Sequence, residues 1–265
     1  MKTKRIGLWG VAWGVLALLY FFLPMLGTFV FSLRMRRGEL SLLAYTTVLA
    51  DPQFLTSFRY SAIMGLLTVT ISILLFVPTV YLIYLRIPKA RPFVEVITVL
   101  PFIIPVIVYV FGLIRTFSRP PFLMTLKPFT TDILMLGGYI VLSMPYIFRA
   151  IDVGMRSIDV RTLTEAAQSM GASWMQTLIN VIFPNLRIAI LSGALISFAT
   201  VIGELILGDF LFRPALGPYM ALTGESLIYE PAALAIISYG LTWTCLGLIQ
   251  FFSRGGSIQR QLTGR

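Results

Sequence analysis

Histidine is absent from this 265-residue sequence, and cysteine occurs once, as Cys245 inside an apolar stretch. Zinc sites, disulfides and histidine-based acid–base chemistry therefore have almost no residues from which to form. Charged residues are scarce as well, at 12% of the sequence, whereas soluble proteins carry about 25%. Together these shortages exclude a large soluble enzyme.

Apolar residues take the place of the missing charges and make up 57% of the sequence. A helix needs about 20 such residues to cross the hydrocarbon of a membrane. Six apolar stretches stand out, at residues 6–31, 60–85, 93–114, 133–148, 188–207 and 232–252. We therefore predict an all-α, polytopic membrane protein with six transmembrane helices in a single domain. Prolines within the stretches are expected to kink the spans without ending them: Pro24, Pro78, Pro101, Pro105 and Pro145.

Lysine and arginine indicate how the spans are oriented. The net charge of +10 is interpreted as a positive-inside bias and contact with anionic lipid, rather than as a nucleic-acid surface. A cytoplasmic N-terminus puts most basic residues in cytoplasmic loops, although Arg34, Arg36 and Arg37 oppose it. The first stretch is too long for a secretory signal and has no A-x-A cleavage site. We predict a multi-pass protein of the cell (inner) membrane with both termini in the cytoplasm.

The longest predicted cytoplasmic segment, residues 149–187, separates the fourth and fifth spans. Thr162, with Glu165 three positions later, forms the capping-box pattern that begins a helix. Gly171 is expected to end this helix. The residues at positions i, i+3, i+4 and i+7 would then share one face: Leu163, Ala166, Ala167 and Met170.

A second capping-box pattern, Ser173 with Gln176, predicts another amphipathic segment that runs to Pro184. Two short helices should therefore lie on the cytoplasmic side of the bundle. They could rest on lipid headgroups as an interfacial elbow. Alternatively, the small side chains of Ala166 and Ala167 would let the first helix enter a groove on another protein. The residues alone leave both interpretations open.

The spacing in this loop resembles a known motif, the EAA loop of ABC importer permeases, EAA-x3-G-x9-I-x-L-P. Val181 and Phe183 stand here in place of the usual Ile and Leu. In that family the EAA helix docks in a cleft of the cytoplasmic ATPase subunit. The resemblance implies a type I ABC importer permease fold and the same coupling role for five residues: Glu165, Ala166, Ala167, Gly171 and Pro184.

The resemblance also implies partners. These are a second, homologous permease subunit, two cytoplasmic ATPase subunits and an extracytoplasmic solute-binding protein. The chain has no Walker A pattern, so it is expected to bind no cofactor itself, not to be an enzyme, and to leave ATP hydrolysis to the ATPase subunits. The alternatives are a membrane scaffold without transport activity and a secondary transporter with Glu204 as its ion site. Neither needs a helix that docks on an ATPase.

Two acids near the end of the fifth predicted span are candidates for the solute pathway. Counted from Ala189, Glu204 falls in the outer third of that span, where an acid usually faces a bundle interior or aqueous cavity. It could instead be an interfacial acid paired with Arg213, and Asp209 should lie nearer the interface. Residues 203–214 also resemble permeases for polyamines, opines and phosphonates. An acid here favours a polyamine-like cation, although the extracellular arginines would suit an anion.

Overall fold

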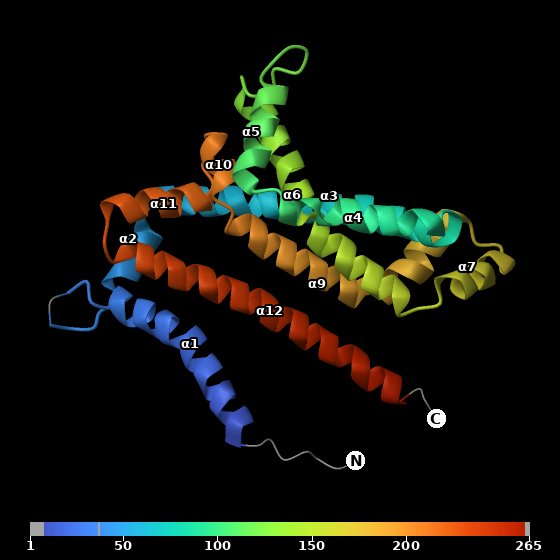
Figure 1. The fold of residues 1–265 in the computed structure, drawn as a ribbon, viewed down its shortest axis with the longest axis horizontal. Coiled ribbons are helices and arrows are strands. Elements are labelled where there is room, and N and C mark those ends of the chain that lie inside the picture. Colours follow the sequence, from blue (N-terminus) through green and yellow to red (C-terminus); the bar gives the residue numbers. More distant parts are fainter. Residues whose placement is uncertain (1–7, 37, 263–265) are drawn as a thin grey trace. The chain divides into compact units, whose positions relative to one another are not determined.

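A computed structural model describes the backbone of residues 8–36 and 38–262, and every element in these ranges is helical (Figure 1). The chain divides into two compact units. The first comprises Met1–Leu55 and Tyr219–Gly240, and the second comprises Thr56–Pro218 and Leu241–Arg265. The boundaries between them fall within three helices, α3, α11 and α12.

The first unit contains α1 (Leu8–Ser32), α2 (Leu43–Ala50), the start of α3 (Pro52–Arg86), the end of α11 (Leu216–Ser226) and the start of α12 (Glu230–Leu262). The hydroxyls of Ser32 and Tyr45 lie 2.7 Å apart and join α1 to α2. The hydroxyl of Tyr219 donates to Asp51 Oδ2 at 2.7 Å. Apolar side chains of α1 are exposed along its length, which suits a helix surrounded by lipid.

The second unit contains most of α3 and the elements that follow it: η1 (Pro88–Ala90), α4 (Arg91–Ile103), α5 (Val106–Phe117), α6 (Pro128–Arg156), α7 (Val160–Ser169), α8 (Trp174–Thr177), the π-helical turn η2 (Leu178–Ile182), α9 (Phe183–Ile202) and α10 (Ile206–Phe210). Glycines let α6 and α9 pack closely side by side (Figure 1). A Cβ on Gly154 of α6 would lie 2.7 Å from the Cβ of Ala189, and one on Gly193 of α9 would lie 2.9 Å from the Cβ of Ala150. Small residues of this kind let membrane helices approach closely.

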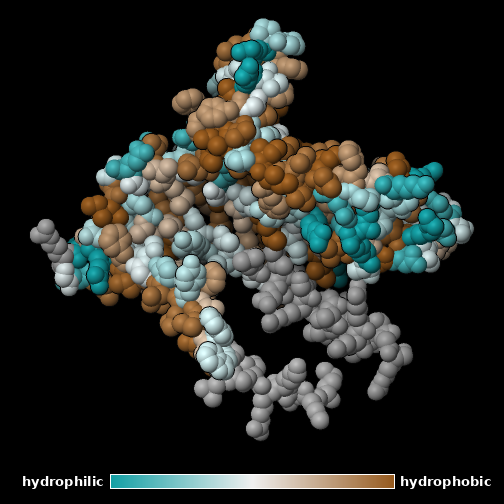
Figure 2. Space-filling view, viewed as in Figure 1, coloured by the Kyte–Doolittle hydropathy of each residue, from teal (hydrophilic) through white to brown (hydrophobic). Residues whose placement is uncertain are grey.

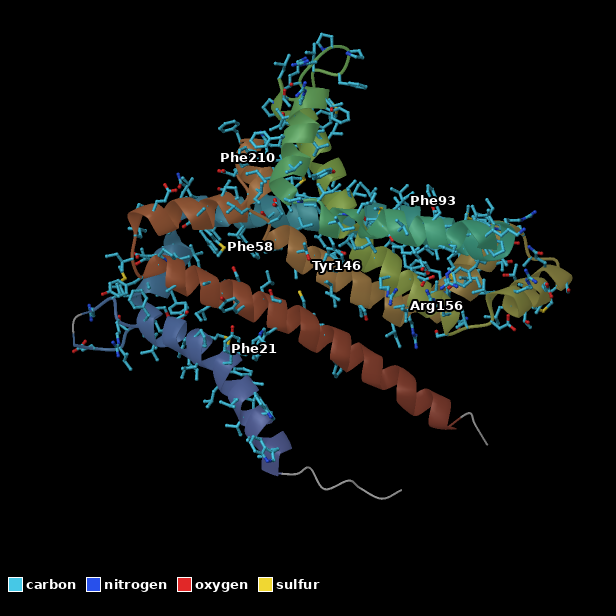
Figure 3. The ribbon with its side chains drawn as sticks, viewed as in Figure 1. Phe21, Phe58, Phe93, Tyr146, Arg156 and Phe210 are labelled. Carbon is cyan, nitrogen blue, oxygen red and sulfur yellow. The ribbon has the colours of Figure 1, made fainter. Side chains whose placement is uncertain are left out.

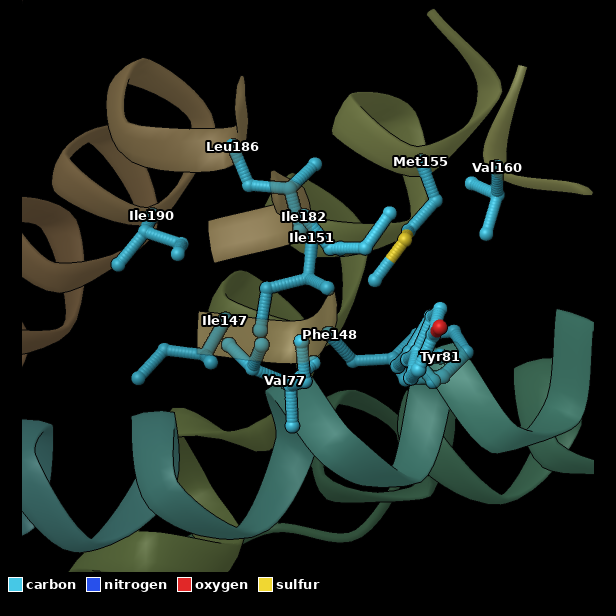
Figure 4. Packing of buried hydrophobic residues seen from close by; sticks show 12 residues of the cluster. Val77, Tyr81, Ile147, Phe148, Ile151, Met155, Val160, Ile182, Leu186 and Ile190 are labelled. Atoms are coloured by element: carbon cyan, nitrogen blue, oxygen red, sulfur yellow. The ribbon is translucent and has the colours of Figure 1, made fainter. Parts of the chain in front are cut away.

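Two apolar clusters form the core of the second unit. One joins α3, α6, η2 and α9 near α7, and Figure 4 shows its side chains, with Tyr81 of α3 close to Phe148 of α6. The other joins α3, α5, α6 and α10 around Met135 and Leu207. Outside these clusters, hydrophobic side chains such as Phe93 and Phe102 of α4 are exposed, whereas hydrophilic residues gather at the end that carries α7 (Figure 2).

Four segments of the described residues are long and apolar enough to cross a membrane: Val11–Ser32, Pro52–Arg86, Pro128–Arg156 and Trp174–Ile202. The consecutive helices Pro88–Ile103 and Val106–Phe117 make a fifth if they count as one broken span. The predicted all-α, membrane-spanning class is therefore confirmed, whereas the number six is not. The sixth predicted stretch, 232–252, lies in α12, where several side chains from 246 onward are outside the described residues.

The third predicted span, 93–114, is wrong as a single helix, because α4 and α5 meet at a bend of 100°. Ile104 is extended, with ψ of 120°, and Pro105 precedes α5. Proline lacks the N–H that would continue the hydrogen-bond ladder, and it disfavours helical dihedrals in the residue before it. The other four prolines lie inside α1, α3, α4 and α6, as predicted.

The predicted bounds of the fourth and fifth spans also need correction. Helix α6 continues past residue 148 to Arg156, and Ile151 and Met155 of this extension are buried in the apolar cluster near α7. The loop predicted at 149–187 is therefore shorter. Helix α9 ends at Ile202, so Glu204 follows the fifth span and does not lie within it.

Candidate functional site

Helix α7 begins three residues earlier than the capping-box pattern predicted. Its N-cap is Asp159, whose Oδ1 accepts the backbone N–H of Thr162 at 3.1 Å. The hydroxyl of Thr162 donates to Asp159 Oδ2 at 2.7 Å. This side-chain bond, with the backbone bond second, holds the pKa of Asp159 below its ordinary value. Thr162 is thus a donor within the first turn, because an aspartate three positions before it makes the stronger cap.

Gly171 ends α7, as predicted. Its φ is +87°, in the left-handed region that favours glycine. The N–H of Gly171 donates to Gln168 O at 2.9 Å, and that of Ala172 donates to Ala167 O at 3.0 Å. These two bonds form a Schellman motif, which satisfies the last carbonyls of the helix.

The second predicted capping box is also confirmed. The backbone N–H of Gln176 donates to the Ser173 hydroxyl, and Gln176 Oε1 accepts the N–H of Ser173 at 2.7 Å. Helix α8 therefore begins at Trp174, and only residues 170–173 separate it from α7. The cap and the glycine turn make a short connection between two hydrogen-bonded helix ends.

The shared apolar face predicted for α7 is wrong. Ala167 is 3% exposed and faces the chain's own bundle, together with Val160 and Thr164. Glu165 and Ala166 are exposed, and Met170 is 83% exposed. A helix of 3.6 residues per turn turns adjacent positions by about 100°, so the two alanines separate once Val160 and Thr164 are buried.

Two contacts and a shared apolar cluster hold α7 and α8 against α3. The Tyr81 hydroxyl lies 2.9 Å from Thr164 Oγ1, and both residues are buried. The ring of Trp174, the first residue of α8, lies 5.8 Å from that of Tyr81. Val160 belongs to the same apolar cluster as Tyr81. The inner face of α7 is therefore fixed to the bundle, whereas Glu165, Ala166 and Met170 on its outer face are exposed.

The prediction that the second amphipathic segment ends at Pro184 is wrong, because helix runs from Trp174 to Ile202 without a break. A π-helical turn, Leu178–Ile182, precedes it, and the N–H of Phe183 donates to Leu178 O. Proline cannot donate to the carbonyl four residues earlier and crowds it. The wider turn just before Pro184 relieves this conflict, as π-turns within α-helices do.

A buried acid that the sequence did not predict lies near the end of α6. The side chain of Asp152 is 1% exposed. Its Oδ1 accepts the Tyr84 hydroxyl at 2.9 Å and lies 3.1 Å from Arg91 Nη2. Its Oδ2 accepts Arg156 Nε at 2.9 Å. Glu95, half exposed, pairs with Arg156 at 2.8 Å and with Arg91 at 3.3 Å.

This group, the Asp152 network, consists of Tyr84, Arg91, Glu95, Asp152 and Arg156. Figure 3 shows Arg156 at the end of α6 that leads to α7. Two signals were visible in the sequence, namely the spacing by four residues of Asp152 and Arg156 and of Arg91 and Glu95. The contributions of α3 and α4 come from residues more than 60 positions away in the chain.

The two acids predicted for the solute pathway lie around α10, and neither pairs with Arg213. Glu204 accepts the N–H groups of Ile206 at 2.8 Å and Leu207 at 2.9 Å, so both of its oxygens cap α10. Asp209 is exposed. Their role in the pathway stays a prediction.

Arg213 pairs instead with Asp132 of α6, with its Nε 2.6 Å from Oδ1 and its Nη2 3.0 Å from Oδ2. The Tyr60 hydroxyl also donates to Asp132. This second cluster therefore joins α3, α6 and the residues after α10. Its partners are up to 153 positions apart in the chain.

Known proteins resemble this chain in sequence and in fold. A family model described as "Binding-protein-dependent transport system inner membrane component" matches residues 65–254. The chain is 26% identical over 217 residues to the probable sulfate transport system permease protein cysT of Prototheca wickerhamii, which covers 79% of this chain and 83% of that protein. It is 29% identical over 161 residues to the molybdate/tungstate transport system permease protein WtpB of Pyrococcus furiosus, 61% of each chain.

Among solved structures, a bacterial alginate ABC transporter in complex with an alginate pentasaccharide-bound periplasmic protein matches with a TM-score of 0.66. The identity is 17%, and the match covers 96% of this chain and 93% of that one. At this identity the likeness shows the fold alone. None of these three proteins is named for a polyamine, so the polyamine prediction gains no support.

Proposed function

This chain belongs to the binding-protein-dependent transport system inner membrane components, the permease subunits of ATP-driven importers, and we propose that α7 couples its solute pathway to a cytoplasmic ATPase. The predicted family and the all-α fold of such permeases are thereby confirmed. A secondary transporter is not favoured, because both oxygens of Glu204, its suggested ion site, already accept backbone N–H groups.

One observation carries the coupling proposal, namely the outer face of α7. Glu165, Ala166 and Met170 are exposed there, while the inner face is bonded to α3. Three residues, 157–159, connect α7 to α6, and residues 170–173 connect it to α8. A short helix held this rigidly would transmit a displacement of its outer face directly to α6 and to the span Trp174–Ile202.

The proposed assembly has the partners that the family description and the resemblance suggest. The family is named for dependence on a binding protein, and the alginate transporter was solved with a periplasmic one. We propose that a second permease subunit, two ATPase subunits and an extracytoplasmic binding protein act with this chain in the inner membrane. ATP is then bound by the ATPase subunits, and this chain carries no cofactor of its own.

The solute proposed here is a small inorganic oxyanion of the sulfate or molybdate type. The curated relatives named above support an oxyanion. A polyamine would need the carboxylate of Glu204, whose two oxygens already accept N–H groups at the start of α10. Uptake of radiolabelled sulfate, molybdate and putrescine by cells with and without the chain tests this choice. Putrescine uptake that depends on the chain, with neither anion taken up, would overturn it.

Cysteine crosslinking tests the coupling face. In a Cys245→Ser background, Ala166→Cys should crosslink to an ATPase subunit in native membranes, with a yield that changes between nucleotide-free and ATP-bound states. Phe122→Cys, exposed in the loop between α5 and α6, is the matched control and should not crosslink. The coupling proposal fails if the ATPase copurifies with the chain but Ala166→Cys crosslinks no better than Phe122→Cys.

A further inference from the structure

The Asp152 network gathers three helices at the base of α7. Asp152 lies near the end of α6, Tyr84 near the end of α3, and Arg91 is the first residue of α4. The two carboxylate oxygens of Asp152 accept hydrogen bonds from three side chains of the same chain, those of Tyr84, Arg91 and Arg156. The guanidinium of Arg91 also lies over the Tyr84 ring, 4.9 Å from its centroid. One buried carboxylate thus fixes the ends of α3 and α4 against α6.

Stability alone is a weak reason for such a group. Removing two charges from water is costly, and a well-packed apolar replacement of a buried ion pair is often as stable. What the ion pairs provide is a defined arrangement, because a carboxylate with donors from three helices is satisfied in only one relative position of them. Glu95 and Arg156, which are more exposed, add a second and solvent-screened link between α4 and α6.

A continuous set of bonds leads from α7 to this carboxylate. Tyr81 and Tyr84 lie almost one turn apart on α3, and the first bonds to Thr164 of α7 while the second donates to Asp152. Only residues 157–159 separate the end of α6 from α7. Movement of α7 therefore reaches Asp152 along two routes, through the end of α6 and through the two tyrosines of α3.

The helix held by Asp152 leads to the other end of the second unit. From Arg91, α4 runs to the 100° bend at residues 104–105, and α5 continues from there. Val110 and Leu113 of α5 pack in the apolar cluster that contains Leu207 of α10. In Figure 1, α5 and α10 lie beside each other. A rigid joint at Arg91 would carry the displacement of α7 to the α4–α5 pair and its neighbour α10.

We propose that Asp152 is a positioning residue that locks α4 to α6, so that the movement of α7 is passed to the α4–α5 pair. This rests on the proposed coupling role of α7. Without the lock, α7 and α6 still move with the ATPase, but α4 no longer follows. The expected consequence is ATP hydrolysis that is poorly coupled to solute movement.

The first experiment compares Asp152→Asn with Glu95→Gln in the complex that copurifies with this chain, reconstituted in proteoliposomes. Both variants neutralise an acid of nearly unchanged shape, but only the first removes the buried one. Asp152→Asn should lower uptake per ATP hydrolysed about tenfold, within the usual range of coupling between sites. Glu95→Gln should change it by less than about twofold, as expected of an exposed pair.

The second experiment measures whether α4 and α6 keep a fixed distance from each other. Spin labels at Val96 of α4 and Val153 of α6, both exposed, report the distance between the helices in a Cys245→Ser background. That distance should be the same with and without ATP in the unmodified network, and should become state-dependent in Asp152→Asn. Tyr84→Phe, which keeps every charge, should show the same change more weakly and decides the matter if Asp152→Asn does not assemble.

The outcomes separate the two proposals. If the unmodified complex takes up no solute with ATP, the proposed function has failed. If it does, and Asp152→Asn and Tyr84→Phe both keep normal uptake per ATP and a state-independent distance, the positioning role of Asp152 is wrong.

Discussion

Replacing Gly171 by alanine should loosen the turn between α7 and α8 through a backbone effect alone. Gly171 has φ of +87°, and a Cβ added there would meet nothing within 4 Å. No clash or new contact therefore complicates the change. Holding an L-residue in the left-handed region costs about 1–2 kcal/mol. A cost of this size raises the population of the open turn, relative to the intact one, by a factor of about 5–30.

Hydrogen exchange of the peptide that covers residues 168–176 measures this population. The amides of Gly171 and Ala172 donate the two bonds that form the turn, so their exchange should accelerate by the same factor. Exchange in Gly171→Asn should be faster than in the unmodified protein and slower than in Gly171→Ala, because asparagine tolerates the left-handed region better than alanine. Uptake should fall in the same order if the rigidity of the turn matters for coupling.

Gly137→Ala is the matched control, since a Cβ at Gly137 also meets nothing within 4 Å but its φ is not positive. Inside α6, this change should stabilise the helix by about 0.5–1 kcal/mol and leave exchange at residues 168–176 unchanged. Equal exchange of that peptide in Gly171→Ala and the unmodified protein would refute the reasoning.

Three further predictions concern the two alanines of α7, the cap of α7 and the start of α10. Ala166→Trp, at an exposed position, should prevent copurification of the ATPase while leaving the chain folded. Ala167→Trp should instead lower the thermal stability of the isolated chain, since overpacking a buried site costs about 1–3 kcal/mol. The cap of α7 should be fully formed above the ordinary Asp159 pKa of 3.8 and be lost as the pH falls through the lowered pKa that Asp159 has in the folded protein. Hydrogen exchange of the Thr162 amide, measured as a function of pH, follows this loss. Loss of protection already at neutral pH would contradict the prediction. Glu204→Gln should weaken the α10 cap by about 1 kcal/mol and lower uptake without loss of assembly, and unchanged uptake kinetics would remove this residue from the pathway.

Local signals explain which parts of the candidate site could be predicted. The Ser173–Gln176 box and the turn at Gly171 involve residues within five positions of each other, so the pattern that specifies them is visible in the sequence. The start of α7 was misplaced because two candidate caps, Asp159 and Thr162, lie three residues apart and compete for the same N–H groups. The outward face of α7 was misassigned for another reason. Periodicity grouped Ala166 with Ala167, whereas the edge of the surface that the bundle covers passes between them, and no local pattern indicates where that edge lies.

The sequence by itself determined that this protein crosses a membrane and that a short helix ending at Gly171 follows the fourth span. Only the tertiary structure decided that Ala167 is buried while Ala166 is exposed, and that Arg213 pairs with Asp132 and not with Glu204. It also brought Arg91 to Asp152, which are 61 residues apart. The physical reason is range: helix caps and turns depend on neighbours in the chain, whereas the partner of a buried charge is set by how distant helices pack.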